Sequence, residues 1–214
     1  ADAVSIPAVC DADTGFGEAV NVGRAVREFE RAGVAGIHIE DQEFPKKCGH
    51  LSGKRLIATE AMVEKIQAAL AARTDPDFLL IARTDARGVT GMSDAIARAQ
   101  RYVEAGADAV FPEALHSAEE FALFVQEVAP AFSTQRAPLF LANMTEFGKS
   151  PYLTVQQFAE MGYRLVIFPL TNFRVMLKAV QDALQQLKRA GTQQGFLDKM
   201  MTRKELYELL RYEG

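Results

Sequence analysis

The stretch FLLIARTD at residues 78–85 shows the pattern that decides the fold. A short, continuous apolar run at 78–82 leads directly into the polar residues Arg83, Thr84 and Asp85. Continuous apolar runs of this length are typical of strands in a parallel sheet, because both faces of such a sheet are covered. The polar residues would then stand at the carboxyl end of a buried strand.

The same pattern recurs along the chain. Further strands are predicted at residues 6–10, 35–39, 109–111, 139–142 and 165–168. Segments of helical periodicity follow the strands at 18–32, 59–72, 93–105, 119–128, 154–161 and 172–190, and a last helix is predicted at 203–210. The sequence therefore predicts an α/β fold of about six β→α units.

The strand ends favour a barrel over a doubly wound sheet. Polar residues stand at or just after the ends of five of the six predicted strands: Asp11, Asp13, Glu40, Asp41, Arg83, Asp85, Glu113 and Asn143. In a (β/α)8 barrel all carboxyl ends converge on one face, whereas a doubly wound sheet binds ligands at its switch point. No G-x-G-x-x-G motif follows the first strand, which argues against dinucleotide binding. A closed barrel needs eight strands and about 250 residues, so we predict an incomplete TIM-type barrel at 1–190 and a helical tail at 191–214.

Composition excludes several classes of function. The 214 residues, 49% of them hydrophobic, suffice for one sizeable core. A net charge of −4 gives no basic footprint for nucleic acid, and no apolar run approaches the roughly 18 residues of a spanning helix. Two cysteines do not make a disulfide framework. We expect a soluble, reduced, cytoplasmic protein that binds neither nucleic acid nor membrane.

Three carboxylates form the first candidate site. Asp11 and Asp13, in the stretch CDADTG, lie two residues apart at a strand end, so their side chains point the same way. Glu40 ends the next strand. Hard oxygen ligands suit Mg²⁺, which takes one or two carboxylates and keeps several waters. We predict a Mg²⁺ site of these three residues; the alternative is that the acids cap the following helix or turn.

The second candidate is the thiol of Cys48 in the stretch PKKCGH at 45–50. Two lysines and His50 would favour the thiolate, and Gly49 gives the loop freedom to move. Such a thiol could act as a nucleophile or as a general acid that protonates a carbanion. The alternatives are an inert buried cysteine, which describes Cys10 better, and a metal site with His50, which no further Cys–His pair supports.

The remaining polar strand ends suggest a clamp for a substrate. Arg83 offers a bidentate fork for a carboxylate, Asn143 and Thr145 offer hydrogen bonds, and Glu113 could orient Arg83 or contact the waters of the metal. Each residue alone is as typical of a structural salt bridge or a turn. As a set they predict a small, oxygen-rich anionic substrate held by Mg²⁺ and arginine.

Several segments together resemble the isocitrate lyase / phosphoenolpyruvate mutase superfamily. They are DADTGFG (11–17), HIEDQ (38–42) followed by KKCGH (46–50), ARTDA (82–86), FPEA (111–114) and ANMTEFG (142–148). The resemblance extends over essentially the whole chain, and KKCGH is specific to the lyase branch. Within that branch the chain is most similar to the lyases of 2-methylisocitrate. Isocitrate lyases are much longer, usually carry tryptophan at the position of Phe111, and have a serine-rich segment in place of 143–148.

The resemblance implies Mg²⁺-dependent retro-aldol cleavage of 2-methylisocitrate, a tricarboxylate, to pyruvate and succinate in the 2-methylcitrate cycle of propionate catabolism. It implies that Asp11 and Asp13 bind the metal and that Cys48 protonates the succinate carbanion, with Lys46 and His50 as supporting catalytic residues. The implied substrate-binding positions are Cys48, Gly49, Arg83, Glu113, Asn143, Thr145, Arg174 and Arg203.

The resemblance also implies a (β/α)8 barrel that forms homotetramers, with the last barrel helix exchanged between neighbouring subunits. The family has two βα units before the strand at 6–10. They carry a Ser-Gly-Gly substrate loop, a tyrosine proposed as the base and a further metal-shell aspartate, and this chain has no counterpart of them. We therefore expect the chain to be a fragment of an active enzyme, inactive or poorly folded alone. The alternatives are an isocitrate lyase, a superfamily member acting on oxaloacetate or a phosphonate, and a truncated barrel without activity.

Overall fold

The computed structural model describes residues 1, 3–132 and 137–212, and the chain divides into two compact units. The first unit, Ala1–Pro169, contains the β-strands and most of the helices. The second unit, Leu170–Gly214, is helical. Each unit has its own internal packing and is described by itself.

The strands form where the sequence predicts them. Their bounds are β1 Val9–Asp11, β2 Gly36–Glu40, β3 Leu79–Thr84, β4 Ala109–Pro112, β5 Leu141–Asn143 and β6 Leu165–Ile167. Each overlaps a predicted strand, so these predictions are confirmed. Strand β1 begins later than the predicted range 6–10, because its pairing with β2 begins only at Val9 and Gly36. Pro7 has no N–H group to donate to a neighbouring strand.

The strands pair in parallel and in chain order. In the described part of the chain, β1, β2, β3 and β4 form one sheet in that order, and β5 pairs with β6. A parallel bridge between Val110 and Phe140 joins β4 to the segment that leads into β5. The strand order does not reverse within these sheets, whereas a doubly wound sheet contains such a reversal.

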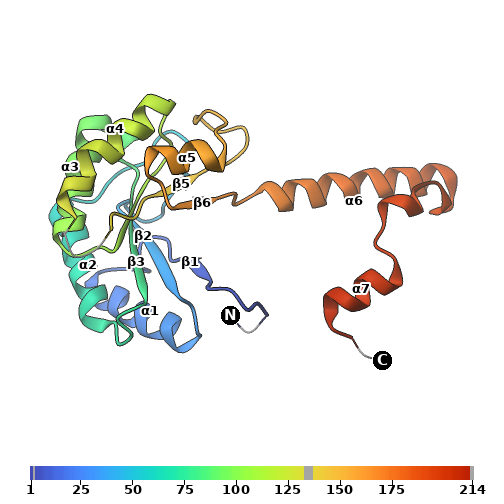
Figure 1. Cartoon of the computed structure of the whole chain (residues 1–214), viewed down its shortest axis with the longest axis horizontal. Helices are drawn as coiled ribbons and strands as arrows, with labels where there is room; N and C mark the ends of the chain where they lie inside the picture. Colours follow the sequence, from blue (N-terminus) through green and yellow to red (C-terminus); the bar gives the residue numbers. More distant parts are fainter. Residues whose placement is uncertain (2, 133–136, 213–214) are drawn as a thin grey trace. The chain divides into compact units, whose positions relative to one another are not determined.

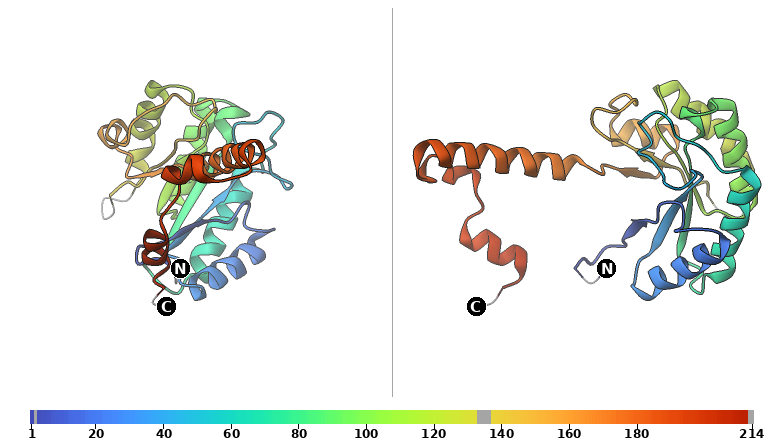
Figure 2. Two further views of the ribbon diagram at one scale, coloured as in Figure 1. Left: turned by 90° about the vertical axis from the view of Figure 1, so that its right-hand side faces the viewer. Right: turned by 180° about the vertical axis from the view of Figure 1, so that it is seen from behind.

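Helices alternate with the strands of the first unit. Their bounds are α1 Ala19–Arg31, α2 Thr59–Ala72, α3 Met92–Glu104, α4 Ala118–Val128 and α5 Val155–Met161. Short 3₁₀ turns lie at η1 Ala86–Gly88 and η2 Ala129–Ala131. Each helix packs against the next one in the chain, and Figures 1 and 2 show α1 to α4 side by side along one side of the sheet. The predicted β→α alternation is confirmed.

Both faces of the sheet carry buried apolar side chains, because alternate residues of a strand point in opposite directions. On β3, Leu80 and Ala82 belong to the core that includes residues of α1 and α2. Ile81 packs on the other face, in a second cluster with Phe111 and Leu141. We call this second face the inner face of the sheet. It positions the candidate site, because the strand ends that continue it carry polar residues.

The second unit contains α6 Thr171–Ala190, η3 Gln194–Lys199 and α7 Arg203–Leu210, at the places where the sequence predicts helices for α6 and α7. Along α6, the apolar residues Phe173, Leu177, Val180, Leu184 and Leu187 recur at steps of three and four, which is the pattern of an amphipathic helix. Within the described ranges, no helix combines the length and apolar character needed to cross a membrane.

Candidate active site

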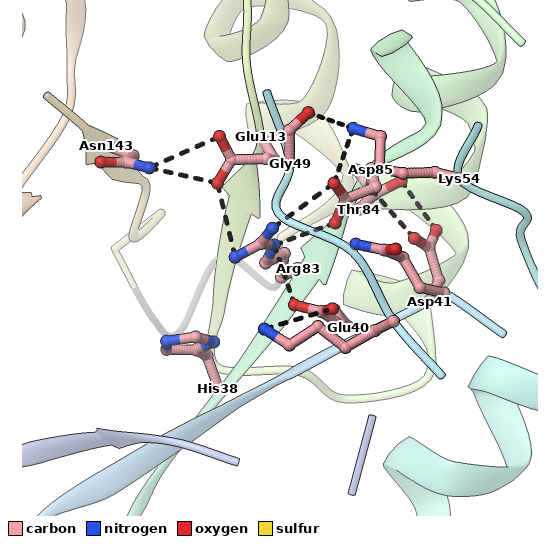
Figure 3. A network of polar contacts seen from close by, with 12 residues as sticks. His38, Glu40, Asp41, Gly49, Lys54, Arg83, Thr84, Asp85, Glu113 and Asn143 are labelled. Atoms are coloured by element: carbon pink, nitrogen blue, oxygen red, sulfur yellow. Dashed lines mark hydrogen bonds and ion pairs between the residues drawn. The ribbon is translucent and has the colours of Figure 1, made fainter. Parts of the chain in front are cut away.

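Polar side chains gather where the inner face of the sheet reaches the carboxyl ends of its strands (Figure 3). Arg83 follows Ile81 by two residues, and Glu113 follows Phe111 by two, so each polar residue continues the face of an apolar one. The strand-end residues are Asp11 from β1, Glu40 from β2, Arg83 from β3, Glu113 directly after β4 and Asn143 from β5.

Arg83 is surrounded by three carboxylates. Its Nε donates to Asp85 Oδ2 at 2.9 Å and lies 3.2 Å from Glu40 Oε2, and its Nη1 lies 3.4 Å from Glu113 Oε2. Burial alone would lower the pKa of Arg83, but these carboxylates, Glu113 first among them, raise it above the ordinary value. The guanidinium also lies 5.1 Å over the ring centroid of Phe111. Arg83 is therefore a fixed, permanently charged group at the centre of the site.

Lys46 lies between two of the three predicted metal-binding carboxylates. Its Nζ is 2.7 Å from Asp13 Oδ1 and 3.8 Å from Glu40 Oε1. Asp13 has a positive φ of 48°, a conformation that aspartate adopts more readily than most residues, and its N–H donates to Asp11 Oδ1 at 2.8 Å. The structure thus gathers Asp13 and Glu40 about one ammonium group and connects Asp11 to them.

Glu40 is the buried member of this acidic set. It has no exposed surface, and neither of its oxygens accepts a hydrogen bond from a described residue. Burial raises the pKa of Glu40 to about 7, although Arg83 and Lys46 act in the opposite direction. The cations nearest to its oxygens are Arg83 Nε at 3.2 Å and Lys46 Nζ at 3.8 Å, and a buried carboxylate is stabilised by such nearby cations.

The acidic set fits a metal ion that keeps its own water ligands. Among residues 1, 3–132 and 137–212, no three Asp, Glu, His or Cys side chains lie close enough together to ligate one ion directly. Mg²⁺ retains several waters and takes few carboxylates directly. Asp11, Asp13 and the donor-poor Glu40 are therefore compatible with a hydrated Mg²⁺ ion and not with a closed cage of protein ligands.

His38 belongs to the same site, although the sequence analysis did not select it. Its Nδ1 lies 3.6 Å from Asp11 Oδ1, and its ring packs edge-on against Phe111 at 5.5 Å between centroids. Burial lowers the pKa of His38, against the opposing effect of Asp11. The residue stands two positions before Glu40 on β2, so strand alternation was the pattern that could have identified it.

The thiol loop, residues 43–53, starts and ends at neighbouring backbone positions. Gln42 and Leu56 form an antiparallel bridge, and the N–H of Ile57 donates to the carbonyl of Asp41 at 3.0 Å. Within the loop the side chain of Cys48 is exposed. The thiol is therefore accessible in a loop whose two ends are fixed. Cys10, by contrast, is half-buried against the core beneath α1 and α2.

Gly49 and His50 seat the thiol loop on the strand-end site. A Cβ atom on Gly49 would lie 2.1 Å from Glu113 Cγ and 2.9 Å from Arg83 Nη2, so no larger residue permits this approach. His50 Nε2 lies 3.1 Å from Glu113 Oε1, and His50 Nδ1 accepts the N–H of Lys149 at 3.0 Å. A neutral imidazole that accepts at Nδ1 carries its proton on Nε2, where it faces Glu113.

Glu113 is ionised between these neighbours. Burial would raise the pKa of Glu113, but Arg83 and His50 together hold it below the ordinary value. Asn143 Nδ2 also donates to Glu113 Oε2 at 3.3 Å. Glu113 therefore connects three of the predicted substrate-binding positions, namely Gly49, Arg83 and Asn143.

The other predicted substrate-binding residues lie in different places. Thr145 is buried in the loop after β5. Arg174 is in the first turns of α6 and Arg203 is the first residue of α7, both in the second unit. The substrate-binding roles of these three residues stay predictions.

Lys54 connects the thiol loop to Arg83, and the sequence analysis did not select it (Figure 3). Its Nζ donates to the carbonyl of Gly49 and, at 2.9 Å, to Asp85 Oδ1. The side chain of Lys54 is only 1% exposed. From the sequence, Asp85 is recognisable only as a polar strand end. No local pattern pairs Lys54 with Asp85, because the two residues are 31 positions apart.

Fold and site together define a parallel α/β protein whose strand ends combine carboxylates, a buried arginine and an accessible thiol. The family model described as phosphoenolpyruvate phosphomutase matches residues 1–188. A 2-methylisocitrate lyase of Aeropyrum pernix is 59% identical over 209 residues, which cover 98% of this chain and 65% of that protein. The chain therefore belongs to the phosphoenolpyruvate phosphomutase family, as the sequence segments indicated.

Solved structures give the same result. A crystal structure of 2,3-dimethylmalate lyase is 38% identical, with a TM-score of 0.86 over 96% of this chain and 66% of that one. A phosphonopyruvate hydrolase in complex with oxalate and Mg²⁺ is 34% identical, with a TM-score of 0.82 over 98% of this chain and 70% of that one. The chain thus spans about two thirds of the length of the relatives it matches.

Proposed function

We propose that the protein containing this chain is a carbon–carbon lyase that cleaves 2-methylisocitrate to pyruvate and succinate. The observation that carries the proposal is the seating of an accessible thiol loop on the Arg83–Glu113 pair through Gly49 and His50. A proton donor on this loop would lie next to a group suited to bind carboxylates, which supports the proposal. The similarity to the lyase of Aeropyrum pernix supports the choice of substrate.

The substrate is a tricarboxylate, and the polar strand ends supply groups that match it. Arg83 uses Nε and one N–H of Nη2 on Asp85, and Nη1 faces Glu113 at 3.4 Å. One N–H on each of Nη1 and Nη2 is then left for a substrate carboxylate. Asn143 and Thr145 add hydrogen bonds. The family resemblance adds Arg174 and Arg203 as proposed substrate-binding residues; both belong to the second unit.

Cys48 is the proton donor in this proposal. Breaking the carbon–carbon bond leaves the electron pair on the carbon that becomes part of succinate, and this carbanion must take up a proton. The hydroxyl group of the other half loses its proton to a base as it becomes the ketone of pyruvate, a role that the family resemblance gives to a tyrosine with no counterpart in this chain. A thiol on an exposed loop beside the arginine can supply the proton to carbon. His50 orients Glu113, and Lys46 partly neutralises Asp13 and Glu40, so both residues act in support.

Asp11, Asp13 and Glu40 would hold Mg²⁺ together with water. When bound, the ion supplies Lewis-acid stabilisation of negative charge on the oxygens of the 2-hydroxy acid half. The fully buried, donor-poor carboxyl of Glu40 supports this assignment, as does the Mg²⁺ in the complex of the related phosphonopyruvate hydrolase.

We further propose that residues 1–190 belong to a (β/α)8 barrel, with a helical tail at 191–214, in a cytoplasmic homotetramer. Parallel pairing in chain order supports the barrel, and so does the apolar inner layer that includes Ile81, Phe111 and Leu141. The apolar stripe of α6, from Phe173 to Leu187, supports exchange of this helix between subunits. Such a face gains stability when it packs against another protein surface.

The test is the substrate preference of the intact protein. With Mg²⁺ present, initial rates of product formation are measured with 2-methylisocitrate, isocitrate, oxaloacetate and phosphonopyruvate. We expect the highest kcat/KM with 2-methylisocitrate. A higher kcat/KM with isocitrate would assign the protein to isocitrate lyase, and preference for either of the other two would refute lyase chemistry at this site.

A further inference from the structure

The backbone of the residue on each side of Cys48 is held by a buried side chain. Before the thiol, the N–H of Lys47 donates to Gln42 Oε1 at 3.0 Å, and the carbonyl of Lys47 accepts from Gln42 Nε2 at 2.9 Å. After the thiol, the carbonyl of Gly49 accepts from Lys54 Nζ. Counted as whole residues, backbone included, Gln42 and Lys54 are only 1% and 6% exposed. An exposed thiol is thus bracketed by two buried residues that lie just outside the thiol loop.

Lys54, which donates to the carbonyl of Gly49, is also connected to Arg83 through Asp85 (Figure 3). Asp85 accepts from Lys54 Nζ through Oδ1 at 2.9 Å and from Arg83 Nε through Oδ2 at 2.9 Å. The carboxylate of Asp85 therefore accepts hydrogen bonds from both Lys54 and Arg83. Charge-assisted hydrogen bonds of this kind are about twice as strong as neutral ones, so the pair of contacts favours a single arrangement of loop and arginine.

Asp85 is itself held by Asp41, the residue that follows β2. Asp41 Oδ1 accepts the N–H of Asp85 at 2.9 Å, and Asp41 Oδ2 accepts the hydroxyl groups of Thr84 and Tyr102, each at 2.8 Å. Asp41 has no exposed surface. The contacts run without a gap from Tyr102 on α3 through Asp41 and Asp85 to Lys54. The backbone next to the thiol is therefore connected to the rigid part of the fold.

We propose that Gln42 and Lys54 are positioning residues that hold the thiol of Cys48 at the strand-end site, and that Lys54 couples this placement to Arg83 through Asp85. The inference rests on the proposed lyase function, because it assumes that the thiol donates a proton to carbon. Neither residue contacts the substrate. Both act through the backbone of Lys47 and Gly49, and proton transfer is sensitive to displacements of about 1 Å.

The experiment compares Lys54→Met and Gln42→Leu with the wild type in the intact protein. Both changes keep the bulk of the side chain and remove its hydrogen bonds. The control is Arg73→Met. The Arg73 guanidinium also donates to a backbone carbonyl, that of Phe78, and to a carboxylate, that of Asp108. These contacts lie at the amino end of β3, away from the site. Two quantities are measured: steady-state kinetics with Mg²⁺ and 2-methylisocitrate, and amide hydrogen exchange of residues 44–52 without substrate.

The proposal predicts a loss of kcat without a matching loss of binding. In both variants kcat should fall roughly 10- to 100-fold, while KM changes by less than about threefold. Exchange at residues 44–52 should become about tenfold faster, with the core strands unchanged. Arg73→Met should lower the melting temperature and leave kcat unaltered.

Two results would overturn the proposal: kcat close to that of the wild type in both variants, or unchanged exchange in the thiol loop. If the wild type itself does not cleave 2-methylisocitrate, the proposed function fails. The exchange measurement then still decides whether Gln42 and Lys54 hold the loop.

Discussion

His50 Nε2 lies 3.1 Å from Glu113 Oε1, while the other oxygen of Glu113 lies 3.4 Å from Nη1 of Arg83. One buried carboxylate thus connects the thiol loop with the arginine that we propose for substrate binding. A Cβ atom on Gly49 would clash with Glu113, so the loop can pack this closely on the carboxylate only with glycine at position 49. Glu113 is therefore a contact that the thiol loop and the arginine share.

The first prediction concerns the thiol itself. Cys48→Ser replaces the proton donor with a much weaker acid, so kcat should fall by about 10²- to 10⁴-fold. The melting temperature should stay the same, because the side chain is exposed. Steady-state assays with 2-methylisocitrate measure kcat, and thermal unfolding measures the melting temperature.

The matched control is Cys10→Ala. Cys10 is half-buried against the core on the other face of β1, so this change should reduce stability slightly and leave kcat unaltered. Full activity of Cys48→Ser would remove the thiol from the chemistry and revive the assignment to a superfamily member with another reaction.

The second prediction concerns the seat of the loop. Gly49→Ala introduces a Cβ atom that would lie 2.1 Å from Glu113 Cγ, so the loop must move outward. We expect kcat/KM to fall roughly 100-fold, with little change in the free energy of unfolding. Gly195→Ala, at a position where a Cβ atom meets no neighbour, serves as the control. Equal kinetics for the two variants would contradict the seating of the loop.

The third prediction concerns the choice between the two tricarboxylates. Phe111 is fully buried beneath Arg83, and isocitrate lyases usually carry tryptophan at this position. Phe111→Trp adds volume at the floor of the site, so the ratio of kcat/KM for 2-methylisocitrate over isocitrate should fall by about 10- to 200-fold, the range that one methyl group can supply. An unchanged ratio of kcat/KM would show that Phe111 does not contribute to the discrimination between the two substrates.

The fourth prediction concerns stability against pH, at a pair outside the candidate site. Hydrogen bonds from Arg87 hold the pKa of Glu120 below its ordinary value, against the opposing effect of burial. The contribution of this pair is therefore present above the ordinary glutamate pKa of 4.5 and is lost as the pH falls through the lower pKa of the folded state.

Glu120→Gln should accordingly lower the free energy of unfolding by about 1 kcal/mol at neutral pH, and the difference should shrink towards zero on acidification. Urea unfolding across this pH range measures it. Glu104→Gln, which breaks an exposed pair with Arg101, is the control and should have a smaller effect at every pH. A difference for Glu120→Gln that stays constant as the pH falls would contradict the assigned direction of the shift.

The secondary structure was predictable because its causes are local. The run at 78–82 is apolar and continuous, and a strand forms there. Thr154 and Gln157 form a capping box at the start of α5, and Gly162 ends that helix in a left-handed conformation. The convergence of strand ends on one face of a barrel also grouped Arg83 with Glu113. These features follow from residues that are close together in the sequence.

The partners of the charged residues were not predictable, because they depend on contacts between distant segments. The sequence predicts that Lys46 supports the thiol and the carboxylates, and in the structure its Nζ lies nearest Asp13. Lys54 gave no local pattern, since its partners lie across the thiol loop and at the end of β3. His38 was missed although its spacing from Glu40 would have allowed its detection.

The most direct test of the account is the stoichiometry of products formed from 2-methylisocitrate by the intact protein in the presence of Mg²⁺. The account predicts pyruvate and succinate in equal amounts, and loss of both when a chelator removes the metal. Absence of pyruvate, or undiminished turnover after chelation, would contradict it.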